Sequence, residues 1–423
     1  MPPASHPDPR AAAIVAVGSE LTAGAHVDTN SAWLSQRLAE RGAEVRWHLT
    51  VGDDLDELVE ALRFCAERCG TVVVGGGLGP TVDDLTREAV ARAAGVELEH
   101  REELAEEIRR RFAAVGYRMP EANLRQALVP AGAVAYDPVG TAPAFRCELG
   151  GAVLYALPGV PWELQQLAER DVLPDVADRL GAGAVVTRLV RVAGMGESSV
   201  AEAVDPVLAD LVASGTVALG YLATNGEIQV ELTGRGADVA AARAATEPAV
   251  AAVRAALGAK VVGVDDETLE QVVLRLLEAR GQTVAFAESA TAGAASARLA
   301  RVPGAATALR GGLVVYATEC KTLLAGVDPD LVAAEAPVSL PVTAALAAAV
   351  RERAAADWGV GITGVAGPDP QDGVEVGTCV WAVHGPDGLV EVKQRHVPGD
   401  RATVQARLVV SALDALRRAL LAT

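Results

Sequence analysis

One stretch decides the fold of the last third of the chain: Val284-Ala-Phe-Ala-Glu288-Ser289-Ala-Thr291-Ala-Gly293. Its apolar run ends at Glu288-Ser289 and is followed by small residues, a pattern that predicts a buried strand turning into a helix. The serine then lies at or near the helix N-terminus, beside free backbone N–H groups. A second apolar run, at 313–316, predicts a strand that ends at Tyr316 and leads to Lys321 at the start of the next helix.

Lysine is rare in this sequence. Of the 37 lysines and arginines, only Lys260, Lys321 and Lys393 are lysines. A buried lysine can lose its proton near neutral pH, which an arginine cannot do. A serine becomes a useful nucleophile only with a base nearby, and a Ser–Lys pair is one recognised arrangement. The spacing also fits a simpler interpretation, in which Ser289 caps a helix and Lys321 is a solvated surface residue.

Several motifs surround this pair: Ala287-Glu-Ser-Ala-Thr-Ala-Gly293, Val302-Pro-Gly304, Gly311-Gly-Leu-Val-Val-Tyr316, Lys321 and Ile362-Thr-Gly-Val-Ala-Gly-Pro368. Together they resemble the carboxy-terminal domain of the CinA family, which includes nicotinamide mononucleotide deamidases. The resemblance implies that Ser289 attacks the carboxamide carbon, that Lys321 is the general base, and that Tyr316 assists proton transfer or orientation. No cofactor is expected for this reaction. The substrate-binding residues it implies are Glu288, Thr291, Gly293, Thr363, Gly364, Gly367 and Arg401.

The sequence departs from the family pattern at two places. The family usually reads Glu-Ser-Cys-Thr-Gly-Gly where this chain has Ala290 and Ala292, and we expect these small-for-small changes to be neutral. The family often has two serines after the Pro-Gly turn, where this chain has Ala305 and Ala306. The loss of a hydroxyl at Ala306 is expected to affect the rate more than the reaction.

Length and composition set the broader limits. A chain of 423 residues should hold two or three domains, and 51% hydrophobic with 22% charged residues is typical of a globular protein. A formal net charge of −18 argues against a nucleic-acid partner. We find no apolar run as long as a membrane helix and no apolar signal core, so we expect a cytoplasmic protein without a membrane partner. Its Pro-rich residues 1–10 are expected to be a disordered lead.

The cysteines argue against a disulfide framework. The sequence holds five of them, an odd number, and none forms a CxxC pair. Reduced thiols are the interpretation that fits this pattern.

The domain expected over residues 11–180 alternates strands with helices. Strands are predicted at 11–17, 43–50 and 71–74, with a helix from Asn30, as its cap, to Arg41 and another after Asp53-Asp54. This rhythm indicates a parallel sheet covered by helices on both faces. In such sheets ligands bind at the carboxyl ends of the strands.

A glycine-rich segment follows the third predicted strand: Gly75-Gly-Gly77-Leu-Gly79-Pro-Thr81-Val-Asp83-Asp84-Leu-Thr86. Glycines allow backbone N–H groups to approach a phosphate closely, and the start of a helix favours negative charge. Adjacent carboxylates beside a phosphate make sense if a divalent cation lies between them. The alternative is a glycine-rich turn in which Asp83 or Asp84 caps the next helix.

The wider pattern resembles the amino-terminal CinA domain: Gly18-Ser-Glu-Leu21, Asp28-Thr-Asn30, Asn123-x-x-Gln126-Ala-Leu-Val-Pro130, Gly140-Thr-Ala-Pro143 and Leu157-Pro-Gly-Val-Pro161. That domain is related to molybdopterin-binding domains, and several relatives are ADP-ribose pyrophosphatases. The resemblance implies a divalent metal such as Mg²⁺, held by Glu20, Asp83 and Asp84. It implies nucleotide binding by Asn30, Gly76, Gly77, Gly79 and Thr81.

Residues 185–258 predict a small α+β module with the order strand, helix, strand, strand, helix, in which Thr224-Asn225-Gly226 is a hairpin turn. It contains no catalytic cluster, and we expect it to link domains or mediate oligomerisation. The third domain, 265–423, opens with an amphipathic helix, continues with a strand pair near 374–397 and ends with a helix at 401–421.

The sequence as a whole therefore predicts an α/β protein that hydrolyses nicotinamide mononucleotide to nicotinate mononucleotide and ammonia. A metal-dependent activity on ADP-ribose-like molecules is expected in the first domain, and a homodimer is expected from the family. Two alternatives stay open: a molybdopterin-related binding or transferase protein, and a nucleotide-sensing competence protein without turnover.

Overall fold

The computed structural model describes residues 7–114, 116–181, 183–224 and 226–422. It divides into two compact units, one formed by the chain up to Val186 with Gly234–Ala245, the other by Thr187–Thr233 with the chain from Thr246 onward. Within the described ranges, no helix is both long and apolar enough to cross a membrane.

The first unit is built on a six-stranded sheet with the order β2-β1-β3-β8-β7-β6. The pairs β2–β1, β1–β3 and β3–β8 are parallel, whereas β8–β7 and β7–β6 are antiparallel. A separate antiparallel pair joins β4 and β5. The bounds are β1 (Asp8–Val17), β2 (Glu44–Val51), β3 (Cys69–Gly75), β4 (Leu98–His100), β5 (Leu128–Pro130), β6 (Val134–Tyr136), β7 (Ala144–Leu149) and β8 (Ala152–Leu157).

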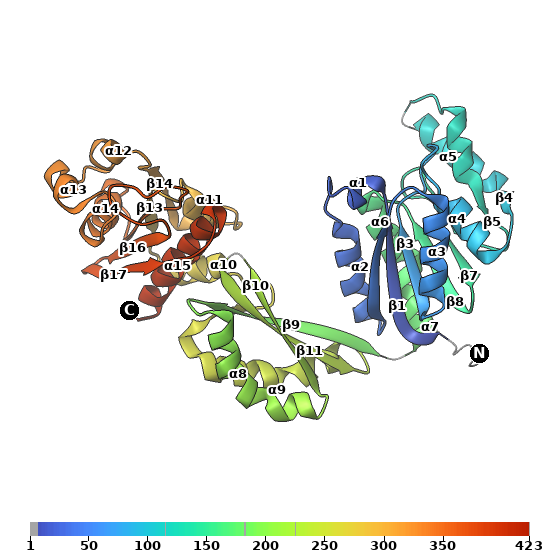
Figure 1. Ribbon diagram of the computed structural model, residues 1–423, viewed down its shortest axis with the longest axis horizontal. Coiled ribbons are helices and arrows are strands. Elements are labelled where there is room, and N and C mark those ends of the chain that lie inside the picture. The colour runs from blue at the N-terminus through green and yellow to red at the C-terminus, as the bar shows by residue number, and fades with distance from the viewer. Residues whose placement is uncertain (1–6, 115, 182, 225, 423) are drawn as a thin grey trace. The chain divides into compact units, whose positions relative to one another are not determined.

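Helices cover both faces of this sheet, as Figure 1 shows for α2 and α3 on either side of β1. The face that carries Ile14 and Tyr155 packs on α2 (Thr29–Glu40), α6 (Pro161–Leu167) and α7 (Leu173–Leu180). The opposite face packs on α3 (Leu55–Ala66), α4 (Thr86–Ala94) and α5 (Glu102–Ala114). Shorter elements are α1 (Ser19–Thr22), η1 (Glu121–Ala127) and the π-helical turn η2 (Ala168–Val172).

Three predictions for this unit need correction. The parallel sheet is confirmed for four strands, but β7 and β6 are antiparallel because short turns such as Gly150-Gly151 reverse the chain. The predicted lead is too long, because β1 begins at Asp8, while residues 1–6 lie outside the described ranges. The cap of α2 is Asp28, whose carboxylate accepts from the Ser31 N–H, and not Asn30.

The second unit contains two sheets. The middle module forms a four-stranded sheet, β10-β11-β9-β12, and the last domain a five-stranded sheet, β14-β13-β15-β16-β17. β13 pairs in parallel with β14 and β15, and the pairs β15–β16 and β16–β17 are antiparallel, as predicted for the last strand pair. The bounds are β9 (Ala184–Ala193), β10 (Val217–Thr224), β11 (Glu227–Gly236), β12 (Val261–Val264), β13 (Val284–Glu288), β14 (Leu309–Val314), β15 (Trp358–Gly364), β16 (Thr378–Gly385) and β17 (Gly388–His396).

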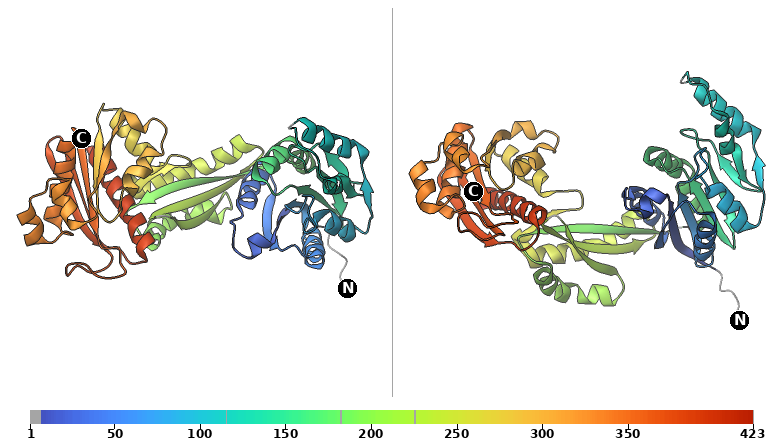
Figure 2. Two further views of the ribbon diagram at one scale, coloured as in Figure 1. Left: turned by 90° about the horizontal axis from the view of Figure 1, so that it is seen from above. Right: turned by 45° about the horizontal axis from the view of Figure 1, so that its top comes forward.

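The five-stranded sheet is also covered on both faces. Phe286 and Trp381 face a core shared with α10 (Leu269–Glu278), α11 (Ala294–Ala300) and the long α15 (Arg401–Ala422), drawn in red in Figure 2. Ala285 and Ala287 face α12 (Thr318–Leu323), α13 (Pro329–Glu335) and α14 (Leu340–Arg353). The remaining elements are α8 (Glu197–Ala213), α9 (Val239–Leu257), η3 (Gly258–Lys260) and η4 (Ala305–Thr307).

The predicted order of the middle module is confirmed, with β10 and β11 as sheet neighbours. Asn225, in the predicted turn between them, lies outside the described residues.

Candidate active sites

Ser289 directly follows β13, in the turn that leads to α11. Its N–H donates to the carbonyl of Ile362 on β15 at 2.9 Å, which continues the strand pairing by one residue and fixes the turn to the sheet. Only 6% of the residue is exposed. The helix begins at Ala294, so Ser289 lies in the turn and not at the helix N-cap, which is Gly293.

Lys321 lies on α12, and its Nζ is 3.3 Å from the Ser289 Oγ and 3.3 Å from the Val315 carbonyl oxygen. It is 1% exposed, so the interpretation as a solvated surface residue is wrong. Burial lowers the pKa of Lys321 below its ordinary value, and the nearby Cys320, Asp372 and Glu319 raise it to a smaller extent. The pair therefore has the contact and the environment that base-assisted nucleophilic attack requires.

The Glu288 side chain holds the turn after Ser289 in place through hydrogen bonds. Its carboxylate is fully buried and accepts five hydrogen bonds. The donors are the hydroxyls of Thr291 (2.7 Å) and Ser296 (2.6 Å) and the N–H groups of Gly293 (3.1 Å), Ala295 (3.0 Å) and Ser296 (2.8 Å). Charge-assisted bonds to unsatisfied N–H groups at a helix start are strong. The structure thus places Glu288, Thr291 and Gly293 in a network that shapes the nucleophile turn.

Tyr316 and Arg401 lie together. The hydroxyl of Tyr316 contacts one guanidinium nitrogen of Arg401, and the other donates to the Gly367 carbonyl oxygen at 2.8 Å. Tyr316 is half exposed. Because its contact is with Arg401, the geometry favours an orienting role for Tyr316 over proton transfer.

Thr363 and Gly364, at the end of β15, are buried. The Thr363 hydroxyl is 2.7 Å from that of Thr343 on α14, and a β-carbon at Gly364 would lie 2.9 Å from the Thr378 carbonyl oxygen. Sequence reasoning missed one contact in this region, in which Gln405 donates to the Ala290 carbonyl oxygen at 2.7 Å. The signal was available, because Gln405 follows Arg401 by one helical turn and shares its face of α15.

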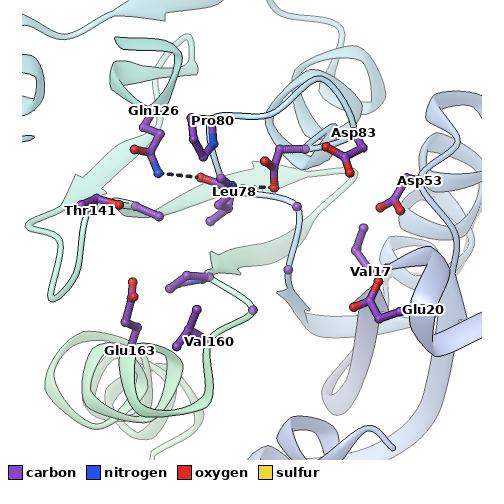
Figure 3. Close-up of a pocket in the computed structure, with 18 residues that line it drawn as sticks. Val17, Glu20, Asp53, Leu78, Pro80, Asp83, Gln126, Thr141, Val160 and Glu163 are labelled. Carbon is purple, nitrogen blue, oxygen red and sulfur yellow. Dashed lines mark hydrogen bonds between the residues drawn. The ribbon is translucent and has the colours of Figure 1, made fainter. Parts of the chain in front are cut away.

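The amino-terminal candidate site is a cavity of about 460 Å³. Its lining begins where β1, β2, β3 and β8 end, so it lies at the carboxyl ends of the parallel strands, as predicted. Figure 3 shows Glu20, Asp53 and Asp83 on one side and Glu163, Thr141 and Gln126 on the other. Sequence reasoning missed Asp53 and Glu163 as lining residues. Asp53 lies two residues beyond the end of β2, and Glu163 lies two residues beyond the Pro-Gly-Val-Pro motif that follows β8.

The two adjacent aspartates have different surroundings. Asp84 accepts from the N–H of Gly79 at 2.8 Å, and from the N–H and hydroxyl of Thr81 at 2.8 and 2.5 Å. It closes the glycine-rich loop, and neither aspartate caps α4, whose N-cap is Leu85. Asp83 is exposed, and its pKa is lowered by hydrogen bonding to the Thr81 side chain.

Buried residues that the sequence did not single out hold the loop in place. The Arg87 guanidinium donates to the carbonyl oxygens of Leu78 and Gly79 at 2.6 and 2.8 Å, and burial lowers its pKa to about 10. The Thr86 hydroxyl donates to the Gly76 carbonyl oxygen at 2.7 Å. Gly76 has a φ of 108°, and a β-carbon there would collide with the Val17 carbonyl oxygen.

Asn30 borders a smaller adjoining cavity of about 250 Å³, which also includes Glu20 and Gly159. Its amide nitrogen donates to the Gly159 carbonyl oxygen at 2.8 Å, and in the described part of the chain its buried amide oxygen has no partner.

A metal ion at this site requires ligands from the substrate. Among the described residues, no group of three or more His, Cys, Asp or Glu side chains is arranged to hold a cation. Of the three predicted ligands, Asp84 is occupied by the loop, which leaves Glu20 and Asp83 facing the cavity. Mg²⁺ is commonly held by one or two carboxylates together with substrate phosphates, so these two residues fit such a cation.

Comparison with known proteins places these sites in a family. A CinA-like protein of Frankia casuarinae is 46% identical over 416 residues, which cover 97% of this chain and 96% of that protein. The chain belongs to the CinA family. CinA-like proteins of Anaeromyxobacter sp. and Prochlorococcus marinus are 42% and 39% identical over 413 residues, which cover 96% of this chain and 98% and 95% of theirs.

The domain matches follow the same division. Residues 13–182 match the probable molybdopterin binding domain, 187–263 the damage-inducible protein CinA KH domain, and 266–420 the CinA C-terminal domain. A solved CinA structure from Thermoplasma acidophilum is 35% identical with a TM-score of 0.37, and covers 41% of this chain and 99% of that chain. A CinA superfamily structure from Klebsiella pneumoniae is 29% identical with a TM-score of 0.36, and covers 37% and 97%.

The departures from the CinA pattern have unequal consequences. Ala292 has a φ of 50°, in the left-handed region where glycine is favoured, so the backbone conformation there is less favourable for this alanine than for the glycine of the family pattern. Ala290 is buried in the core beside the nucleophile turn. Ala305 is buried on η4 and Ala306 is exposed there.

Proposed function

We propose that the carboxy-terminal domain is an amidohydrolase that converts nicotinamide mononucleotide to nicotinate mononucleotide and ammonia. The observation that carries this proposal is the buried contact between the Lys321 Nζ and the Ser289 Oγ. A neutral lysine at this distance can accept the serine proton, and burial favours the neutral form.

The reaction then proceeds in two halves. The Ser289 Oγ attacks the carboxamide carbon while its proton passes to Lys321, and Lys321 returns the proton to the departing ammonia. Water hydrolyses the acyl-serine by the same route in reverse. The Ser289 N–H donates to Ile362 and is not free for the oxyanion, so the N–H groups of Ala290 and Thr291, next along the turn, are our candidates for its donors.

The nucleotide would be held on the side of Arg401. A guanidinium suits a phosphate, and Arg401 is exposed and oriented by Gly367 and Tyr316. The half-exposed Tyr316 ring also offers a face to the pyridine ring.

The direct test measures ammonia release and identifies the nucleotide product for the intact protein and for Ser289→Ala. We expect turnover by the intact protein and loss of nearly all activity in the variant, with an unchanged melting temperature. Binding of nicotinamide mononucleotide without turnover by the intact protein would favour the nucleotide-sensing alternative.

We infer a second activity for the amino-terminal domain, the metal-dependent hydrolysis of a nucleoside diphosphate compound such as ADP-ribose. The observation that favours it is the cavity at the carboxyl ends of the parallel strands. This cavity combines a glycine-rich loop, held in place by Arg87, with the carboxylates Glu20 and Asp83. A bound divalent cation would neutralise charge on the diphosphate. Release of AMP and ribose 5-phosphate from ADP-ribose tests this activity, and tight pterin binding without release would favour the molybdopterin-related alternative.

A further inference from the structure

Glu163 stands on the wall of the amino-terminal cavity opposite the other carboxylates. It belongs to the first turn of α6, and in Figure 3 it lies across the cavity from Glu20, Asp53 and Asp83. Within the described residues, no hydrogen bond to its carboxylate is present, so its oxygens face the cavity. A half-buried carboxylate that accepts no hydrogen bond keeps its oxygens available to accept a proton.

The fold makes room for this side chain. A β-carbon at Gly140 would collide with the Glu163 carboxylate, so the carboxylate occupies the space that a side chain at residue 140 would fill. Gly140 precedes Thr141, which lines the same cavity. The glycine therefore sets where the carboxylate lies.

Burial leaves Glu163 a stronger base than an exposed glutamate. Burial raises the pKa of Glu163, and Arg111 on α5 lowers it to a smaller extent. The other ionisable groups lining the cavity are Glu20, Asp53, Asp83 and Asp84.

We propose that Glu163 is the general base that activates the attacking water in the amino-terminal domain. This inference rests on the proposed diphosphate hydrolysis. The water oxygen forms a bond to one phosphorus atom while one water proton passes to the Glu163 carboxylate. The bond from that phosphorus to the bridging oxygen breaks, and its electron pair stays on the leaving phosphate. The proton on Glu163 is later released to solvent.

The chemistry favours this role over phosphate binding. A carboxylate facing a diphosphate repels it, so Glu163 cannot serve as a phosphate ligand. Figure 3 shows it across the cavity from Glu20 and Asp83, the two carboxylates that would hold the cation, which leaves its oxygens to act on a water molecule and not on the cation. The remaining alternative is that Glu163 accepts hydrogen bonds from ribose hydroxyls, which affects binding more than turnover.

The test compares the full-length protein with Glu163→Gln, using ADP-ribose with Mg²⁺ or Mn²⁺ and measuring AMP and ribose 5-phosphate. Glu103→Gln, an exposed glutamate in the same domain, is the matched control. We expect Glu163→Gln to lower kcat by about 100-fold or more with little change in KM, because general bases contribute on this scale. We also expect the rise of kcat with pH to disappear in this variant. Gly140→Ala, which displaces the carboxylate without removing it, should lower kcat by a smaller factor.

Each outcome decides a different point. If the unmodified protein is active and Glu163→Gln keeps its kcat, with or without a raised KM, Glu163 is not the base and the pyrophosphatase function stands. If the unmodified protein releases no product with either metal, the pyrophosphatase function fails and the role of Glu163 fails with it.

Discussion

Replacing Lys321 by methionine tests the amidase most directly. Methionine is also unbranched and fits a site that is 1% exposed, but it cannot accept the Ser289 proton from the 3.3 Å position of Nζ. General-base assistance contributes roughly 10²- to 10⁴-fold, which corresponds to about 2.7 to 5.4 kcal/mol of activation free energy. We therefore expect ammonia release from nicotinamide mononucleotide to fall by that factor. Lys321→Arg should fall as far, since arginine stays charged.

The matched control is Lys393→Met, which removes a partly exposed lysine paired with Glu391 on β17. It should leave the rate unchanged. The intact enzyme should gain activity as pH rises through a lysine pKa below the ordinary 10.5, because only the neutral amine is a base. Activity of Lys321→Met within a factor of a few of the intact enzyme, or a pH profile unchanged by the substitution, would refute the Ser–Lys mechanism.

The remaining predictions concern stability and the two loops. Because burial lowers the pKa of Lys321, the unfolded chain binds the lysine proton more tightly than the folded chain does. The buried lysine therefore destabilises the fold fully at pH values below its folded pKa, and this destabilisation vanishes above 10.5. Lys321→Met should accordingly be more stable to urea than the intact protein, by a margin that shrinks as pH rises. Glu288→Gln should lower the free energy of unfolding in urea by roughly 3 kcal/mol. The reason is that the amide NH2 of glutamine would face N–H and hydroxyl groups that now donate to the carboxylate. Ala292→Gly should raise stability by about 0.5 to 1 kcal/mol by relieving the left-handed backbone, whereas Ala297→Gly inside α11 should lower it by about 1 kcal/mol. Asp84→Asn should lower the melting temperature by loosening the glycine-rich loop, and equal melting temperatures for this variant and the intact protein would contradict the role given to Asp84.

Sequence periodicity predicted the elements around the nucleophile well. The apolar run before Ser289 corresponds to β13, and Lys321 lies on the helix after the second strand, as expected; that strand, β14, spans Leu309–Val314 and so ends two residues before Tyr316 and not at it. Two neighbouring parallel strands of one sheet bring their carboxyl ends together, so Ser289 and Lys321 are in contact although they are far apart in the sequence.

The roles of neighbouring polar residues were harder to predict, because they depend on where loops close. Asp83 and Asp84 are equivalent in the sequence, yet the structure shows Asp84 accepting from the backbone N–H groups of Gly79 and Thr81, whereas Asp83 is exposed at the cavity. Glu288 adjoins the nucleophile and was interpreted as a substrate ligand. Its partners are N–H groups at the start of α11, whose position the local sequence does not define.

An ion pair connects the middle module to α11, the helix that follows the nucleophile. Arg298 on α11 donates to Glu227 on β11 of that module at 2.6 Å and also contacts Glu270 on α10. Both carboxylates are buried, so removing Arg298 would leave two buried negative charges without this cation. The opposite end of the same helix donates to Glu288 through Ala295 and Ser296. One short helix thus contacts both the module and the turn that carries the nucleophile.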